Sequence, residues 1–130
     1  MDCVFCKIIN KEIPSKIVYE DDTVIAFLDV NPATRGHTLV LPKIHTNNIL
    51  DTDSETFIHL MNVSKMLGGR IKEKLGASGL NILINTGESA GQSVMHTHVH
   101  LIPRYEIDGL TITSKKENYD LDKILKELDE

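Results

Sequence analysis

The stretch "MHTHVHLI", residues 95–102, places a histidine at every second position and sets the interpretation of the chain. Alternate residues of a β-strand face the same side of a sheet, so His96, His98 and His100 would project together. The β-branched and apolar residues between them would face a core. On an α-helix the three imidazoles would spread around the cylinder. The stretch therefore predicts a strand with a row of imidazoles on one face.

The composition of the chain limits the class of protein that can contain this strand. The chain has 130 residues, 41% hydrophobic and 25% charged, which predicts one globular domain over residues 1–130. A formal net charge of -5 argues against nucleic acid or a membrane surface as partner, although a small phosphate ligand remains compatible. There is no long apolar run, and the first ten residues lack a secretory signal pattern. We expect a cytoplasmic protein whose two cysteines form no structural disulfide.

The rest of the chain predicts an α+β fold. Runs rich in β-formers predict five strands, at residues 16–20, 24–29, 37–42, 80–86 and 94–102. A capping-box pattern at Thr52–Glu55 predicts a long helix that runs to about Leu75 and ends at Gly76. Its predicted apolar face consists of Phe57, Leu60, Met61, Ser64, Leu67, Ile71 and Leu75.

Two shorter elements complete the prediction: a short helix or turn at residues 5–10, and an amphipathic helix carrying Leu121, Ile124, Leu125 and Leu128. The last two strands are joined by a short loop, which favours an antiparallel pair. The expected architecture is one five-stranded antiparallel sheet with the long helix on one face.

The histidine row has three interpretations. The imidazoles could be incidental surface residues, which the otherwise apolar strand disfavours. They could be three ligands of a catalytic metal, although no carboxylate stands beside the row in sequence. They could serve nucleophilic catalysis, in which an imidazole nitrogen attacks phosphorus. The small-residue loop Gly87–Ser93 supports the third interpretation, because its backbone N–H groups can approach an anion.

The cysteine pair "CVFC", Cys3 and Cys6, has the spacing of half a tetrahedral zinc site. A redox pair and two free buried thiols are the alternatives. His59 lies in the predicted long helix, off its apolar face, and is expected at the surface or an interface.

The stretch "GQSVMHTHVHLI" resembles the signature of the histidine triad (HIT) family of nucleotide hydrolases and transferases. That signature alternates three histidines with apolar residues, and Thr97 is a mild departure. The resemblance extends over residues 3–104 and includes "FLDVNP", "GHTLVLPKIH" and "ILINTGESAGQS" in the family's order. It implies a HIT-like fold that dimerises into a ten-stranded sheet.

The resemblance also implies roles for individual residues. It makes His98 the nucleophile, His100 a phosphate contact and Ser93 a hydrogen-bond donor beside the leaving group, with His96 completing the triad. It assigns Asp29 to the ribose hydroxyls. The other nucleotide-binding positions that it implies are Asn85, Gln92 and His37 near the phosphate, and Phe5, Ile8, Phe27 and Val30 around the base.

Many bacterial relatives with an N-terminal cysteine pair bind structural zinc, which by resemblance implies the ligands Cys3, Cys6, His45 and His96. The expected function is hydrolysis of an adenosine 5'-phosphoramidate or related purine nucleotide, close to the Hint (nucleoside phosphoramidase) branch, through a nucleotidyl-histidine intermediate. The alternatives are a diadenosine polyphosphate hydrolase and a non-catalytic nucleotide-sensing zinc module. Residues 105–130 do not match the tail of that branch, which leaves substrate preference open.

Overall fold

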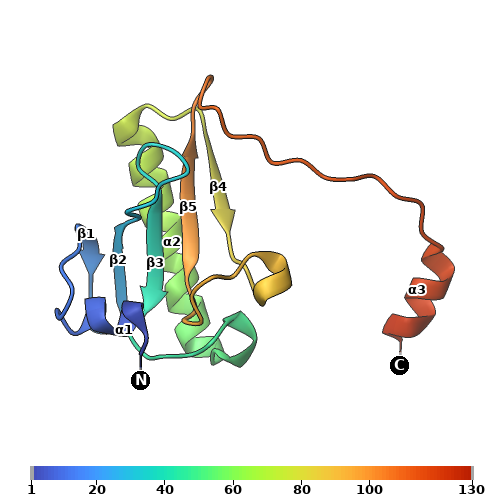
Figure 1. Ribbon diagram of the computed structural model, residues 1–130, viewed down its shortest axis with the longest axis horizontal. Coiled ribbons are helices and arrows are strands. Elements are labelled where there is room, and N and C mark those ends of the chain that lie inside the picture. Colours follow the sequence, from blue (N-terminus) through green and yellow to red (C-terminus); the bar gives the residue numbers. More distant parts are fainter. Residues whose placement is uncertain (1, 130) are drawn as a thin grey trace.

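The structure is a computed structural model that describes residues 2–129. Five strands form one sheet in the order β1-β2-β3-β5-β4, and every neighbouring pair is antiparallel, as predicted. Figure 1 shows the sheet with the long helix α2 behind it and the short helix α3 far from both. The elements are α1 Val4–Ile9, β1 Ile17–Glu20, β2 Val24–Leu28, β3 Thr38–Pro42, α2 Ser54–Leu75, β4 Gly79–Leu83, β5 Val99–Arg104 and α3 Leu121–Leu128, with 3-10 turns at Ile49–Asp51 and Glu88–Ala90.

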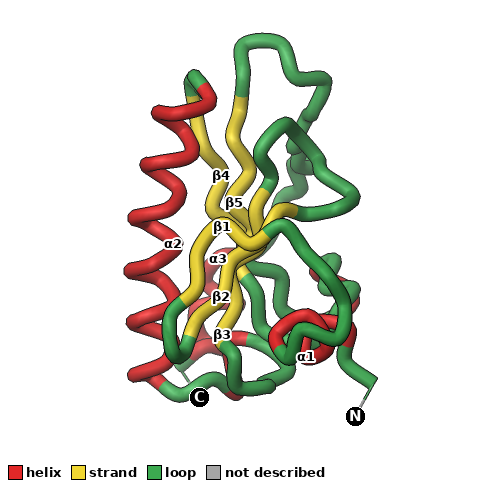
Figure 2. Tube along the Cα trace, turned by 90° about the vertical axis from the view of Figure 1, so that its left-hand side faces the viewer, coloured by secondary structure: helices red, strands yellow, loops and turns green. Residues whose placement is uncertain are grey.

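Helix α2 lies along one face of the sheet, and α1 lies on the other side (Figure 2). On the face under α2, Val40 and Val99 join a core cluster with Leu60, Val63 and Leu67 of that helix. On the opposite face, α1 covers a second cluster that contains Phe5, Ile8, Ile25, Phe27, Leu39 and Leu41. Because Val99 and Leu101 face α2, the histidines between and before them face the α1 side.

The long helix begins one residue later than its capping pattern suggested. Asp53 is the N-cap, and its carboxylate accepts the N–H of Thr56 at 3.0 Å. Thr52 instead ends the preceding 3-10 turn, and its hydroxyl lies 3.1 Å from that of Thr97. Gly76 ends the helix in the left-handed conformation at φ 70°, as predicted.

The buried face of α2 also differs in part from the prediction. Val63 and Gly68 are buried although the pattern had not included them, and Phe57 is 36% exposed. A Cβ added at Gly68 would lie 2.7 Å from Leu80 Cδ2, so this glycine lets the helix approach β4 closely. Gly69 has no such neighbour within residues 2–129.

Two predicted strands have different limits in the structure. β4 ends at Leu83 rather than at residue 86, because its ladder with β5 stops at the pair Leu83–His100. β5 begins at Val99, so His96 and His98 lie in the segment that leads into it. The N–H of Thr97 donates to Thr46 O at 2.8 Å, in the segment after β3, instead of to a strand. Among residues 2–129, no helix is long and apolar enough to cross a membrane.

Candidate active site and metal cluster

The three histidines of the row divide between two neighbouring sites. His98 and His100 lie together, with ring centroids 4.9 Å apart. His96 instead lies 4.9 Å from the ring of His45, in a cluster with the cysteines. The ring of Phe5 separates the two groups, since it packs edge-on against both His96 and His98. The predicted row therefore exists, but it contributes to two sites.

The hydrogen bonding of His98 leaves one ring nitrogen free. Its Nδ1 lies 2.6 Å from the backbone carbonyl of His96, which can only accept, so Nδ1 carries the proton. The lone pair of the neutral ring is then on Nε2. Burial lowers the pKa of His98, although the His96 carbonyl and Asp29 oppose this effect, so the neutral ring is favoured. A buried imidazole with a free lone pair has the properties of a nucleophile.

A second chain of hydrogen bonds sets the tautomer of His100. The N–H of Ala33 donates to His37 Nδ1 at 2.9 Å, so the proton of neutral His37 is on Nε2. That Nε2 lies 2.9 Å from His100 Nδ1 and donates to it. His100 must therefore carry its own proton on Nε2, where it can donate to an anion. Burial, with His98 and His37 nearby, lowers the pKa of His100 to about 4.

Asp29 stands beside this chain, with its Oδ2 3.6 Å from His37 Nε2. Its Oδ1 accepts the N–H of Asn31 at 2.8 Å, which holds the carboxylate at the end of β2. The ligand atoms of Asp29, His37 and His100 lie within 4.8 Å of one another. However, His37 Nδ1 is occupied as an acceptor, so its Nε2 could bind a metal only as an imidazolate. The group is better suited to holding protons than a cation.

A cavity of about 530 Å³ brings most of the predicted nucleotide-binding residues together. Its polar end contains Asp29, His37, His98, His100 and Ser93, and its apolar part contains Phe5, Ile8, Phe27 and Val30. Sequence reasoning missed Leu39, Ile13 and Val94, which also line it. Leu39 could have been found, because it lies two residues after His37 on the same face of β3.

Gln92 and Asn85 are placed differently from the other predicted residues. Gln92 is 2% exposed and all its hydrogen bonds go to backbone groups: it accepts from the N–H of Gly87 and donates to the carbonyls of Asn47 and Val94. The Gln92 side chain therefore stabilises the loop 87–93 from within and joins it to the backbone of residue 47. Neither Gln92 nor Asn85 lines the 530 Å³ cavity. Their contact with a phosphate stays a prediction.

A second cavity of about 500 Å³ adjoins the first. The two share Val4, Ser93 and Val94, so Ser93 stands between them. The second cavity is otherwise lined by Asp2, Cys3, His45, Asn47 and Met95, and by neither His98 nor His100. A substituent that leaves a group bound near Ser93 on the side away from His98 could enter this second cavity.

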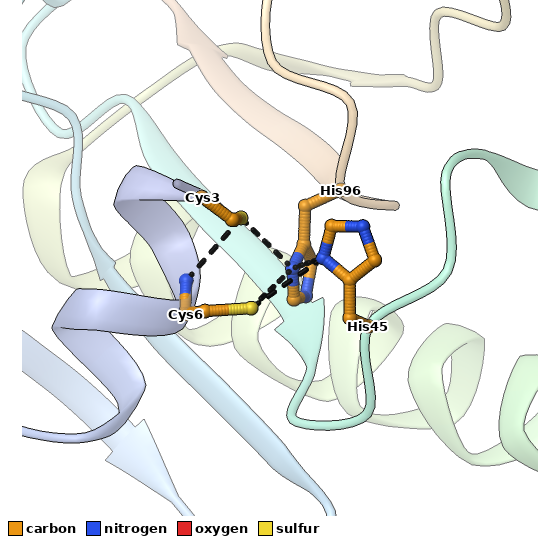
Figure 3. A group of neighbouring side chains, drawn as sticks. All are labelled: Cys3, Cys6, His45 and His96. Carbon is orange, nitrogen blue, oxygen red and sulfur yellow. Dashed lines mark hydrogen bonds between the residues drawn. The ribbon is translucent and has the colours of Figure 1, made fainter. Parts of the chain in front are cut away.

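Figure 3 shows Cys3, Cys6, His45 and His96 pointing toward one another from three separate parts of the chain. His96 Nε2 lies 2.8 Å from the carbonyl of Pro42 and must be its protonated nitrogen, which leaves the Nδ1 lone pair facing the cluster. His96 Nδ1 is 3.5 Å from Cys3 Sγ, 3.6 Å from Cys6 Sγ and 3.1 Å from His45 Nδ1.

These separations match a tetrahedral metal centre. Zn–S bonds of about 2.3 Å and Zn–N bonds of about 2.0 Å give edges of roughly 3.5 Å between N and S and roughly 3.3 Å between two N atoms. Burial, together with the neighbouring Cys3, raises the pKa of the Cys6 thiol. A bound cation would favour the thiolates instead. These four residues can therefore hold a metal ion.

His59 lies at the surface, as predicted, 46% exposed at its side chain. Its Nε2 is 2.7 Å from Asp21 Oδ2, which joins α2 to the β1–β2 turn. This contact is remote from both sites.

Comparison with known proteins agrees with the site. The model of the HIT domain matches residues 10–107. A HIT-like protein of Methanocaldococcus jannaschii is 49% identical over 128 residues, which are 97% of this chain and 98% of that protein. Adenylylsulfatase HINT3 of Arabidopsis thaliana is 37% identical over 98% of this chain and 66% of its own length. The crystal structure of a HIT family member from Bacillus subtilis, 41% identical, superposes with a TM-score of 0.91 over 99% of this chain and 96% of that one. The chain therefore belongs to the HIT domain family.

Proposed function

We propose that the protein hydrolyses purine nucleotides of the adenosine 5'-phosphoramidate type, through a covalent intermediate on His98. The observation that carries the proposal is the free Nε2 lone pair of His98 at the polar end of the 530 Å³ cavity. His100 stands beside it with its Nε2–H available to a phosphate oxygen. Family membership supports a nucleotide as the substrate.

Each residue of the site would have a separate role in this reaction. The apolar part of the cavity would hold the base, and the Asp29 carboxylate would accept hydrogen bonds from the ribose hydroxyls. His98 Nε2 would attack the α-phosphorus, forming a P–N bond while the bond to the substituent breaks. Ser93 would donate a hydrogen bond to the leaving atom. Water would then cleave the bond to His98 and release the nucleoside monophosphate.

The chemistry of the second cavity supports an amine as leaving group. The described residues that line it include one carboxylate, Asp2, and no lysine or arginine. A polyphosphate leaving group would bring several negative charges to that wall, whereas an amine would be neutral or positive. We therefore favour a phosphoramidate over a diadenosine polyphosphate. The name of the relative adenylylsulfatase HINT3 adds adenylyl sulfate as a substrate to be compared.

We further propose that Cys3, Cys6, His45 and His96 hold a structural zinc ion. The ion would join α1, the segment after β3 and the start of the histidine stretch, and so would stabilise the wall of both cavities. His98 is not among its ligands, so the chemical step would not pass through it. Such a site requires reduced cysteines, which supports a cytoplasmic protein.

We propose a homodimer in which two sheets join along β4. The outer side of β4 is a free sheet edge, and its Ile82 and Leu83 are 46% and 38% exposed. Pairing at that edge would give ten strands. Sedimentation at micromolar concentration should therefore give twice the chain mass of 14.6 kDa.

The decisive experiment traps the intermediate. Wild-type protein is quenched during turnover of an α-32P-labelled phosphoramidate, and the adduct is mapped by mass spectrometry. Label should be found on His98, and His98→Ala should lower kcat by at least about 1000-fold while nucleotide binding survives. A metal-hydroxide mechanism predicts no adduct, and activity that chelation abolishes and added metal restores.

Substrate preference is tested by comparing kcat/KM for AMP-phosphoramidate, adenylyl sulfate and diadenosine tetraphosphate. We expect the phosphoramidate to be preferred by tenfold or more. A preference for the dinucleotide would contradict the leaving-group assignment, and nucleotide binding with no hydrolysis of any substrate would favour a sensing module.

A further inference from the structure

The C-terminal helix α3 presents an apolar face that nothing among residues 2–129 covers. Leu121, Ile124, Leu125 and Leu128 follow the i, i+3, i+4, i+7 spacing of one helix face. They are 75%, 37%, 59% and 76% exposed. Figure 1 shows α3 at the end of a long extended segment, remote from the sheet and from α2. A short helix gains most of its stability from packing, so this face requires a partner surface.

The direction in which the arm leaves the domain is held by a compact turn at its start. Arg104 Nε donates to Asp108 Oδ2 at 2.8 Å, and the same carboxylate accepts the N–H groups of Tyr105 and Leu110. Tyr105 also donates its hydroxyl to the carbonyl of Arg35 at 2.6 Å. The arm therefore leaves the end of β5 in a defined direction, past β4 (Figure 1).

A groove of suitable chemistry opens at the opposite end of the sheet. It has a volume of about 420 Å³ and an apolar floor made by Val18, Leu28, Leu67, Ile71 and Leu75. Three cationic side chains line the same groove, those of Arg35, Arg70 and Lys74. It lies between β1, β2 and the second half of α2, and it shares only Leu28 with the 530 Å³ cavity of the candidate active site.

The charges of the arm and the groove are complementary. Helix α3 with its flanking residues, 120–129, contains four acidic residues (120, 122, 127 and 129) and two lysines (123 and 126), a net charge of 2 − 4 = −2. A helix with an apolar face and an acidic residue flanking each end, Asp120 and Asp129, fits a groove with an apolar floor and a cationic wall.

We propose that α3 of each copy docks in the groove of a second copy, so that the two chains exchange their C-terminal arms. The inference rests on the proposed pairing along β4. A dimer joined along β4 continues the sheet on the side where the arm leaves. The edge of the partner's sheet that carries β1, and with it the partner's groove, then lies at the far end of the joined sheet. From β5, where the arm begins, to the partner's β1 there are six strand spacings, which amount to about 29 Å. The sixteen residues 105–120 can span up to roughly 53 Å, so the arm is long enough.

The same arm occurs in a relative whose structure was solved in a crystal. The Bacillus subtilis structure superposes over 99% of this chain, and this coverage includes residues 105–129 as well as the HIT domain. An arm that superposes together with the domain has a preferred direction in both proteins. That agrees with an arm built to reach a fixed surface.

The first test measures association by sedimentation equilibrium. Ile124→Asp and Leu125→Asp together should weaken the dimer at least about tenfold, because they place charge on the docked face. Leu50→Asp is the matched control: Leu50 is 83% exposed and lies outside both α3 and the groove, so its dimer should be unchanged. Since α3 lies outside the core clusters, circular dichroism should show the domain still folded in all variants.

Charge-reversal variants then show whether the arm of one copy docks in the groove of the other copy or in its own. A groove variant carries Arg70→Glu with Lys74→Glu, and an arm variant carries Asp122→Lys with Glu127→Lys. Each alone should associate more weakly than wild type. Mixing them should restore association, because one reversed pair and one natural pair meet in the mixed dimer. Restoration only when all four changes are in one chain would mean docking within a chain and would overturn the proposal.

Crosslinking locates the contact in the unmodified protein. A dimer assembled from light and 15N-labelled chains is treated with a carbodiimide, which joins Lys74 to carboxylates of α3. Crosslinked peptides with one light and one heavy partner are expected. A wild-type monomer would refute both the dimer and the exchange. A stable dimer that is indifferent to the Ile124 and Leu125 changes and yields no such crosslink would refute the exchange alone.

Discussion

His37 offers a prediction whose size follows from two hydrogen bonds. Its Nδ1 accepts the N–H of Ala33, and its Nε2 donates to His100 Nδ1, both at 2.9 Å. This arrangement forces the proton of His100 onto Nε2, where it can meet a phosphate oxygen. His37→Asn keeps a polar group that can serve Ala33 but is too short to reach His100. The tautomer of His100 would then no longer be set.

The expected loss corresponds to one buried hydrogen bond, about 1–3 kcal/mol. If the bond matters in the transition state, this amounts to a fall in kcat of roughly 5- to 150-fold. KM should change less than kcat, because the apolar base pocket is unaltered and Asp29, although 3.6 Å from His37 Nε2, keeps the hydrogen bond from the N–H of Asn31. His37→Gln is the matched control, since its longer side chain brings an amide N–H near the position of Nε2. It should recover most of kcat.

Two measurements check the reasoning. Steady-state kinetics with AMP-phosphoramidate gives kcat and KM for the wild type and both variants. Independently of turnover, 15N–1H NMR of the histidine rings should show His100 protonated on Nε2 in the wild type and His37→Gln, and as mixed tautomers in His37→Asn. Equal losses of kcat in the two variants, or an unchanged His100 tautomer in His37→Asn, would refute the relay. Thermal unfolding of both variants controls for loss of the fold.

Three further predictions concern the same region. Elemental analysis should find one zinc per chain in the wild type and none in the double variant Cys3→Ser with Cys6→Ser. The double variant should also have a lower Tm than the wild type. An unchanged metal content would show that the cysteines are not zinc ligands. Asp29→Asn should raise KM for a ribonucleotide about tenfold, since a carboxylate accepts two hydroxyl donors better than an amide does. KM for the 2',3'-dideoxy analogue should stay unchanged. Equal effects on both substrates would exclude a contact between Asp29 and the ribose hydroxyls. Because burial lowers the pKa values of His98 and His100, kcat/KM should stay level as pH falls through the ordinary histidine pKa of about 6.5 and decline only nearer His100's value of about 4. The free energy of unfolding should also fall as pH drops from about 6.5 to about 4, because these histidines take up protons in the unfolded chain before they do so in the folded one. A stability that rises as pH falls would contradict the buried neutral rings.

Much of this protein is specified by local sequence. Runs of β-forming residues and the apolar spacing of the long helix each lie within one segment, so the strands and the helix were predictable from sequence alone. Gly76 as the helix end follows from the freedom of glycine at positive φ, which is equally local. The motif around residues 91–102 carried the family, because its histidines follow a fixed spacing within one short stretch.

Other features depended on contacts between distant segments. Asp53 rather than Thr52 caps α2, because the hydroxyl of Thr52 is held by Thr46 and Thr97. The inward turn of Gln92 likewise follows from the carbonyl of Asn47, which lies 45 residues away in sequence. No local pattern reports which of two adjacent polar residues will find such a distant partner.

The resemblance to the HIT family implied a division of the histidine row, but the contacts that divide it are set by the tertiary structure. His96 and His98 are chemically alike and two residues apart, and alternation gives them the same face of the segment. One orients its free nitrogen toward Cys3 and Cys6 because the carbonyl of Pro42 holds its other nitrogen, and the other keeps a free Nε2 because the carbonyl of His96 holds its Nδ1. A backbone carbonyl is present at every residue, so sequence cannot tell which imidazole it will hold. Only the folded chain places each carbonyl against one ring nitrogen, and that contact decides which nitrogen of each histidine keeps a free lone pair.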